Sequence, residues 1–290
     1  MSLLTVHHST VYHYREPVAL GEHRMMFRPR ESHDLRLVDS NLLITPRPVQ
    51  LRWLHDPFDN SIAIATFEGV TSELTFESTV VIEHFDSSRL EYPLENYART
   101  YPFRYADEDV ANLARGLTPH YWSAAVAAWA LRFLDRADTT ETIRILTTMT
   151  RSIREQFTYT PRMEKGVQSP DETLWSRRGS CRDFAVLMME AARSLGLAAR
   201  FVSGYIFTPE ASAATHGGAM HAWMQAYLPG AGWIDFDPTN SIIGNRNLIR
   251  VAVAWSPEHV LPLWGTYSGA PGSFVAMDVA VRVTESPGER

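Results

Sequence analysis

The chain has 290 residues, 45% hydrophobic and 21% charged, a composition typical of a globular protein with a sizeable core. Its formal net charge of −6 gives no basic surface for nucleic acid or for an anionic membrane. A single cysteine excludes an internal disulfide and cysteine-rich zinc modules. We see no signal peptide, which would have a basic segment followed by an apolar one, and no apolar run near the ~18 residues of a membrane span. We therefore expect a soluble cytoplasmic protein.

Residues 1–100 are expected to form an N-terminal β-rich domain. Segments rich in β-branched and aromatic residues alternate there with Pro, Asp and Asn turns. The first segment, "LTVHHSTVYHYREPV", is expected to end at Pro17, and "ELTFESTVVIEHFD" alternates apolar with polar residues. Short strands at this spacing predict an antiparallel β-sandwich or meander.

Residues 101–290 are expected to form an α+β domain with its core at about 140–242. A linker and a short helix come first, followed by two segments with helical spacing of their apolar residues. Strands are then expected at "ARFVSGYIF", "HAWMQAYL", "GWIDFDPT", "RVAVAW" and "SFVAMDVAVRVTE". The last of these could return to either domain.

The only cysteine, Cys181, lies at the start of an expected helix. Gly196 suits the position after its C-cap, and Ser180 and Asp183 have the spacing of a capping box. Cys181 then occupies the first helical position, where unpaired backbone N–H groups and the helix dipole favour a thiolate and could stabilise an oxyanion. A small buried residue is an equally good interpretation, so a base must decide.

A candidate base and acid follow in the strand pair "HAWMQAYLPGAGWIDFDPT". If the hairpin loop had four residues, Asp237 would lie opposite Met224, on the wrong face from His221. A loop of odd length, or a bulge, places Asp237 opposite Trp223 and diagonal to His221, within reach of its side chain. We predict this second register.

Alternation leaves two choices open. Asp235 shares a strand face with Asp237, and His216 in the preceding Ala/Gly-rich loop competes with His221 as the base. A Cys–His–Asp group suits acyl transfer, because the imidazole takes the thiol proton and gives it to the leaving amine while the carboxylate orients the ring.

Two blocks, "RRGSCRDFAVLMMEAARSLGLAARFVSGY" and "HAWMQAYLPGAGWIDFDPTN", resemble the transglutaminase-like superfamily, and the β-rich N-terminal segments resemble the N-terminal domain of its bacterial members. The resemblance implies a papain-like core with an N-terminal antiparallel β-sandwich-type domain. It assigns Cys181 as nucleophile, His221 as base and Asp237 as orienting acid. One departure is "WSPEHVLPLWG", where similar proteins usually carry a Gly-Arg-Asp-Tyr-like stretch.

The expected activity is acyl transfer from glutamine side-chain amides or peptide amides through a thioester. A cysteine peptidase or amidase with the same triad is the first alternative, and a catalytically silent binding module is the second. Trp175, Tyr159 and Trp223 are candidates for a second oxyanion donor or for lining the acyl site, although residues of these types are more often packing residues.

We expect no cofactor and no metal. A metal site from His7, His8, His13 and His23 is disfavoured because strand alternation places His8 on the opposite face from His7 and His13. The expected partner is a protein or peptide substrate, with no nucleic acid and no membrane. The sequence predicts no oligomeric state.

Overall fold

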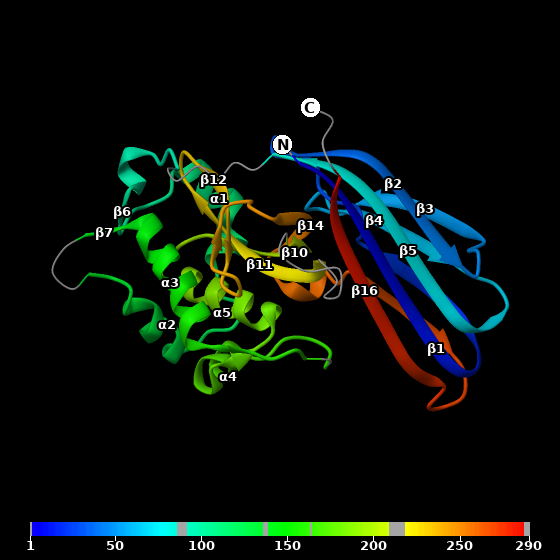
Figure 1. The fold of residues 1–290 in the computed structure, drawn as a ribbon. Coiled ribbons are helices and arrows are strands. Elements are labelled where there is room, and N and C mark those ends of the chain that lie inside the picture. Colours follow the sequence, from blue (N-terminus) through cyan, green and yellow to red (C-terminus); the bar gives the residue numbers. More distant parts are fainter. Residues whose placement is uncertain (1, 86–91, 136–138, 163, 209–217, 287–290) are drawn as a thin grey trace.

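The computed structural model describes residues 2–85, 92–135, 139–162, 164–208 and 218–286. A curled antiparallel sheet stands beside an α+β core, and the core's own sheet lies between the helices and the curled sheet (Figure 1). The α+β class with an N-terminal antiparallel sheet is therefore confirmed.

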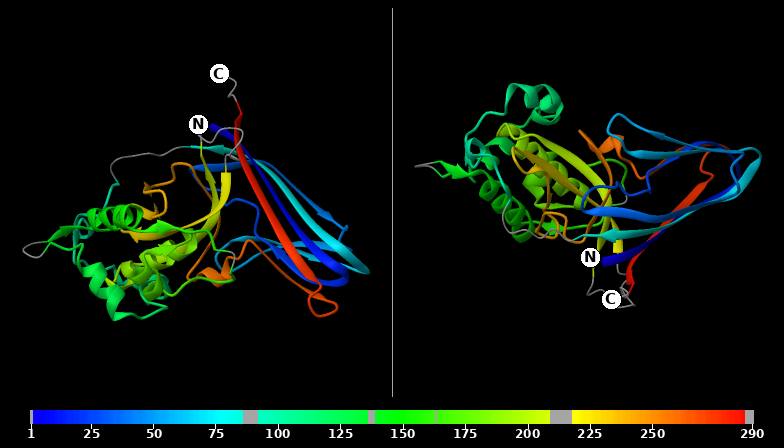
Figure 2. Two further views of the ribbon diagram at one scale, coloured as in Figure 1. Left: turned by 60° about the horizontal axis from the view of Figure 1, so that its bottom comes forward. Right: turned by 90° about the horizontal axis from the view of Figure 1, so that it is seen from above.

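The N-terminal sheet is built around one long strand. Its seven strands are β1 (Ser2–Met25), β2 (Leu35–Thr45), β3 (Gln50–His55), β4 (Ser61–Thr66), β5 (Val70–His84), β15 (Leu263–Ser268) and β16 (Phe274–Ser286). The first half of β1 pairs with β5 and β16, and its last residues pair with β4 and β15. The sheet therefore curls (Figure 2) and encloses Phe76, Leu74 and Val18 in a small core.

The expected end of the first strand at Pro17 is wrong, because β1 continues to Met25. Between His13 and Val18 the register of β1 against β5 shifts, and the pairing with β16 ends at Tyr14. Pro17 lies in this irregular stretch, where its missing N–H costs no hydrogen bond of the ladder.

The late strands divide between the two sheets. The segment "RVAVAW" lies in the core sheet, whereas β15 and β16 pair with β1. The N-terminal sheet is thus formed from both ends of the chain, and β16 runs beside β1 in Figure 1.

The core combines a five-stranded sheet with five helices. In the order β13-β12-β11-β10-β14, the strands are β13 (Ile242–Ile243), β12 (Gly232–Asp237), β11 (Gly218–Leu228), β10 (Ala199–Phe207) and β14 (Leu248–Ala254). The helices are α1 (Asp107–Leu117), α2 (Ala124–Leu131), α3 (Thr142–Gln156), α4 (Pro170–Ser176) and α5 (Cys181–Ser194). Shorter elements are η1 (Asn96–Ala98), β6 (Thr100–Tyr101), β7 (Thr140–Glu141), β8 (Thr158–Tyr159), β9 (Arg178–Gly179) and η2 (Pro257–His259).

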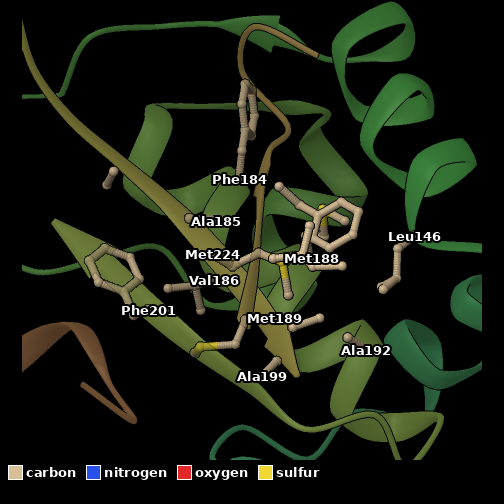
Figure 3. Packing of buried hydrophobic residues seen from close by; sticks show 14 of the residues in the cluster. Leu146, Phe184, Ala185, Val186, Met188, Met189, Ala192, Ala199, Phe201 and Met224 are labelled. Atoms are coloured by element: carbon tan, nitrogen blue, oxygen red, sulfur yellow. The ribbon is translucent and has the colours of Figure 1, made fainter. Parts of the chain in front are cut away.

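Helix α5 lies at the centre of the core, and every residue from Asp183 to Arg193 is buried. A helix that is buried all round packs on several elements at once. Figure 3 shows part of this cluster, in which α5 meets Phe201 of β10, Met224 of β11 and Leu146 of α3. The burial of α5 fixes the position of its first residue.

The N-terminal sheet packs against β10 and β11 through β16, and the loops at one end of it contact the outer edge of β14. Asn60, in the turn between β3 and β4, accepts the backbone N–H of Val253 at 2.9 Å and donates to the carbonyl of the same residue at 2.8 Å. The backbone N–H of Arg30 donates to the carbonyl of Arg250 at 2.9 Å. These contacts use backbone groups on the side of β14 that faces away from β10. Within the described part of the chain, no helix is long and apolar enough to cross a membrane.

Candidate active site

Cys181 is the first residue of α5 and is partly exposed. Ser180 is the N-cap, and Gly196, at φ +75°, follows the C-cap residue Leu195. Both ends of the helix therefore lie where the sequence predicts them. At the first turn, backbone N–H groups have no acceptor within the helix and the dipole is positive, which favours an anion at this position.

The carboxylate of Asp183 fixes the loop that leads to the nucleophile. One oxygen accepts the backbone N–H of Ser180 at 2.8 Å and its hydroxyl at 2.7 Å. The other accepts the backbone N–H of Gln168 and the Arg162 guanidinium, both at 2.8 Å. A Cβ on Gly179 would lie 2.9 Å from Cβ of Asp183, so the glycine lets this loop close on the helix.

The hairpin that carries the candidate base and acid has the predicted odd register. A three-residue loop separates β11 from β12, and Met224 pairs with Phe236. Continuing this register places Asp237 opposite Trp223 and diagonal to His221. Because β12 ends at Asp237, the edge of β11 at His221 has no β12 neighbour.

His221 and Asp237 are joined by a buried hydrogen bond. Nε2 of His221 lies 2.8 Å from Oδ2 of Asp237, and the two residues are 7% and 0% exposed. The Asp237 carboxylate also accepts the backbone N–H of Thr239 at 2.9 Å and Nδ2 of Asn240 at 2.8 Å. Because Nε2 of His221 is hydrogen-bonded to Asp237, Nδ1 is the ring nitrogen that can exchange a proton with Cys181.

The charges around His221 favour its protonated form. Burial alone would lower its pKa, but the Asp237 carboxylate and the contact with Cys181 outweigh burial and raise the pKa of His221 to about 10. Burial alone would raise the pKa of Asp237, but His221 and the donors from Asn240 and Thr239 lower it. The arrangement suits a thiolate–imidazolium pair, the form in which a cysteine attacks a carbonyl carbon.

The alternative acid, Asp235, has a different set of partners. Its carboxylate accepts the indole N–H of Trp223 at 2.6 Å, the amide of Gln225 at 2.8 Å and the guanidinium of Arg250 at 2.8 Å. The geometry therefore pairs the histidine with Asp237. The alternative base, His216, lies outside the described residues.

Of the three candidates for an oxyanion donor or acyl-site residue, Tyr159 lies near the nucleophile. Tyr159 of β8 pairs with Gly179 of β9, two residues before Cys181. Burial is the main cause that raises the pKa of Tyr159, and the charge of Cys181 adds to it. Trp175 is 88% exposed on α4. Trp223 is fully buried and donates its only N–H to Asp235, so the expectation that it could serve as an oxyanion donor is wrong.

The histidines of the N-terminal sheet make separate hydrogen bonds. Nδ1 of His8 lies 2.9 Å from the hydroxyl of Tyr205, and Nδ1 of His23 lies 3.0 Å from the carbonyl of Gly21. Among the described residues, no group of three or more His, Cys, Asp or Glu side chains could hold a metal ion.

Two residues near the site were not predicted. Nδ2 of Asn240 lies 3.3 Å from Nε2 of His221 as well as contacting Asp237, and its position in the turn directly after "DPT" is the signal that could have found it. Arg250 contacts Asp235, and its charge in the otherwise apolar strand "LIRVAVA" is the corresponding signal.

The stretch that departs from the family pattern packs at the junction of the two sheets. The ring of Trp255 lies 5.7 Å from Phe58 and 6.0 Å from Trp233, measured between ring centroids. Its carbonyl accepts the Arg193 guanidinium at 2.6 Å. Trp255 therefore contributes to packing of the core against the turn that contains Phe58.

Two family models match the chain. Residues 4–83 match the bacterial transglutaminase-like N-terminal region, and residues 127–238 match the transglutaminase-like superfamily, together more than half of the chain. The second region contains Cys181 and His221 and ends directly after Asp237. The chain belongs to the transglutaminase-like superfamily.

Relatives of this transglutaminase-like protein match over nearly their whole length. An uncharacterized protein of Mycobacterium leprae is 28% identical over 287 residues, which cover 97% of this chain and 98% of the relative. An uncharacterized protein of Mycobacterium tuberculosis is 28% identical over 300 residues, 98% of this chain and 93% of the relative.

A crystal structure of a candidate cysteine protease from Cytophaga hutchinsonii is similar with a TM-score of 0.71 and 18% identity, covering 99% of this chain and 92% of that one. The similarity extends over the N-terminal sheet as well as the core, so the arrangement of the whole chain occurs in a solved structure. The transglutaminase-like fold supports cysteine-based catalysis in general.

Proposed function

We propose that this transglutaminase-like protein is a cysteine acyltransferase that acts on glutamine side-chain amides or peptide amides of a protein or peptide substrate. The observation that carries the proposal is the buried hydrogen bond between His221 and Asp237, with Cys181 at the positive end of α5 close enough to His221 to help raise its pKa. A structural cysteine needs neither a buried histidine–carboxylate pair nor partial exposure.

The first half of the reaction forms a thioester. The Cys181 thiolate attacks the amide carbon, an Sγ–C bond forms, and the carbonyl oxygen takes the negative charge. Backbone N–H groups of the first turn of α5, and the hydroxyl of Tyr159, stabilise this oxygen. The C–N bond then breaks, and His221 gives the proton on Nδ1 to the leaving nitrogen, which departs as ammonia or an amine.

The second half resolves the thioester. Neutral His221 takes a proton from water or from a primary amine, which attacks the thioester carbon and releases Sγ. Water gives a carboxylic acid and an amine gives a new amide, and both restore the thiolate–imidazolium pair. Hydrolysis of a peptide bond follows the same steps, which is why an amide hydrolase is the alternative. The proposal places the protein in the reducing cytoplasm, where a lone thiol remains reduced.

Incubating the protein with a glutamine-containing peptide, with and without a fluorescent primary amine, tests this proposal. We expect the amine to replace the glutamine side-chain nitrogen when it is present, and deamidation to glutamate when it is absent, both read by mass spectrometry. The Cys181→Ala variant should form neither product. Cleavage of the peptide backbone instead would assign the amide-hydrolase activity. A folded protein with no product above Cys181→Ala would contradict the proposal and favour a binding module.

A further inference from the structure

A largely but not fully buried arginine, Arg250, joins the N-terminal sheet to the strand pair of the candidate site. Nη1 of Arg250 donates to Oδ2 of Asp235 on β12 at 2.8 Å, and Nη2 donates to Oδ1 of Asp34 and to Oγ of Ser32, the latter at 3.0 Å. The side chains of Arg250, Asp34 and Asp235 are 13%, 6% and 3% exposed. Asp34 precedes β2, so the arginine spans the boundary between the two parts of the molecule.

Further hydrogen bonds hold both carboxylates. Oδ2 of Asp34 accepts Nδ2 of Asn245 at 2.9 Å, and its backbone carbonyl accepts the N–H of Phe85 at 2.9 Å. Oδ1 of Asp235 accepts Nε1 of Trp223 at 2.6 Å and Nε2 of Gln225 at 2.8 Å. Each of the four carboxylate oxygens of Asp34 and Asp235 therefore accepts at least one hydrogen bond. The charged hydrogen bond to Asp235 fixes the direction of the Trp223 indole N–H.

The ring of Trp223 supports the imidazole of His221. The two rings are stacked with centroids 5.8 Å apart and an interplanar angle of 25°. Trp223 is completely buried, and a Cβ on Gly204 of the neighbouring strand would lie 2.8 Å from its ring. With β10 close on one side and Asp235 holding its N–H, Trp223 has little freedom to tilt, and a tilt would move the imidazole.

We propose that Asp34, Arg250 and Asp235 are positioning residues, through which the N-terminal sheet sets the plane of Trp223 and hence the orientation of His221. The inference rests on the proposed function of His221 and gives the N-terminal sheet a part in that chemistry. Two other arginines stand near this cluster: Arg200 donates to Gln225 at 2.8 Å, and Arg30 donates to Asn60 at 3.0 Å. Asp34 and Asp235 thus carry negative charge in a group otherwise rich in arginine.

The rate of Cys181 alkylation by iodoacetamide, measured from acidic to mildly alkaline pH, tests the positioning role without a substrate. Asp34→Asn keeps the size of the side chain but removes the charge that holds Arg250. We expect this variant to stay folded and its alkylation rate at acidic pH to be roughly 3- to 30-fold lower than that of the wild type. This range corresponds to a typical coupling free energy between distant sites. Arg250→Lys, whose ammonium lacks the planar fork that contacts both carboxylates, should act in the same direction.

The matched control is Asn60→Ala. Asn60 bonds Val253 of the same strand, β14, across the same boundary; it also accepts from Arg30, but its hydrogen bonds do not include Asp34, Arg250 or Asp235. We expect this variant to lower the melting temperature and to keep the pH profile of the wild type. An unchanged profile in folded Asp34→Asn or Arg250→Lys would overturn the inference. A profile changed equally by Asn60→Ala would overturn it too, because general docking of the sheet would then be the cause.

His221→Ala separates this inference from the proposed function. If Cys181 of the wild type does not react at acidic pH, or if His221→Ala reacts there as fast as the wild type, the activated Cys–His pair is absent and both proposals fail. If that reactivity depends on His221 and persists in Asp34→Asn, the inference on positioning fails alone.

Discussion

Asp237→Asn should lower the turnover number of the glutamine-peptide reaction by roughly 10²- to 10⁴-fold while the protein stays folded. The Asp237 carboxylate accepts a hydrogen bond from Nε2 of His221 at 2.8 Å, which keeps Nδ1 toward Cys181. An asparagine amide that donated to Nε2 would place the ring proton on Nδ1, and the ring could not then take a proton. Because the change acts through the base, kcat should fall much more than KM changes.

The same variant should change how stability depends on pH. The pKa of His221 is raised from 6.5 to about 10, so protonated His221 stabilises the folded state fully below pH 6.5, and this contribution is lost as the pH rises to about 10. The pKa of Asp237 is lowered, so its contribution is present above the ordinary carboxyl range and is lost as the pH falls through and below that range. Urea unfolding should show the largest advantage of the wild type at mildly acidic pH. If the free energies of unfolding of the wild type and of Asp237→Asn differ by the same amount at every pH, the ion pair between His221 and Asp237 is contradicted.

Glu190→Met should reduce the free energy of unfolding by about 3–5 kcal/mol, because it leaves a buried charge without its partner. Nη1 of Arg193 lies 2.7 Å from Oε1 of Glu190, and both side chains are 1% exposed. Oε2 of Glu190 also accepts the backbone N–H groups of His120 at 2.8 Å and Tyr121 at 3.0 Å. The substitution therefore removes the acceptor of two N–H groups and the carboxylate partner of the guanidinium, which keeps its hydrogen bonds to the carbonyls of Ala199 and Trp255. Urea denaturation measures the loss.

Two controls assign this loss to the buried charge. The double variant Glu190→Met/Arg193→Met removes both charges and should be more stable than Glu190→Met alone. Arg144→Met breaks an ion pair with Asp135 that has the short distance of 2.8 Å but side chains 56% and 46% exposed, and should cost no more than about 1 kcal/mol. Equal losses for the buried and the exposed pair would contradict the expectation.

The parts of the site that depend on local sequence could be predicted. The capping residues around Cys181 determine where α5 begins, and the alternation of β11 and β12 with an odd loop determines which face carries His221 and Asp237. Such features are set by neighbours a few residues apart, which a sequence pattern can reveal. The choice of Asp237 over Asp235 came from the family resemblance and agrees with the hydrogen bond to His221.

Contacts between distant segments could not be predicted in this way. Arg250 and Asp34 are 216 positions apart, and no local pattern indicates that they meet. Trp223 was a candidate oxyanion donor, although the predicted register already places Asp235 diagonal to it, where the carboxylate accepts its indole N–H. The continuation of β1 beyond Pro17 likewise depends on how β4, β5 and β15 pair with it.

The pH dependence of Cys181 alkylation by iodoacetamide, read by intact mass for the wild type and His221→Ala, measures whether His221 activates Cys181. We expect wild-type Cys181 to react well below the pH of ~8.5 at which a free thiol ionises, and His221→Ala to lose this reactivity. If both proteins react as an ordinary thiol does, or only after denaturation, Cys181 is a structural residue that His221 does not activate.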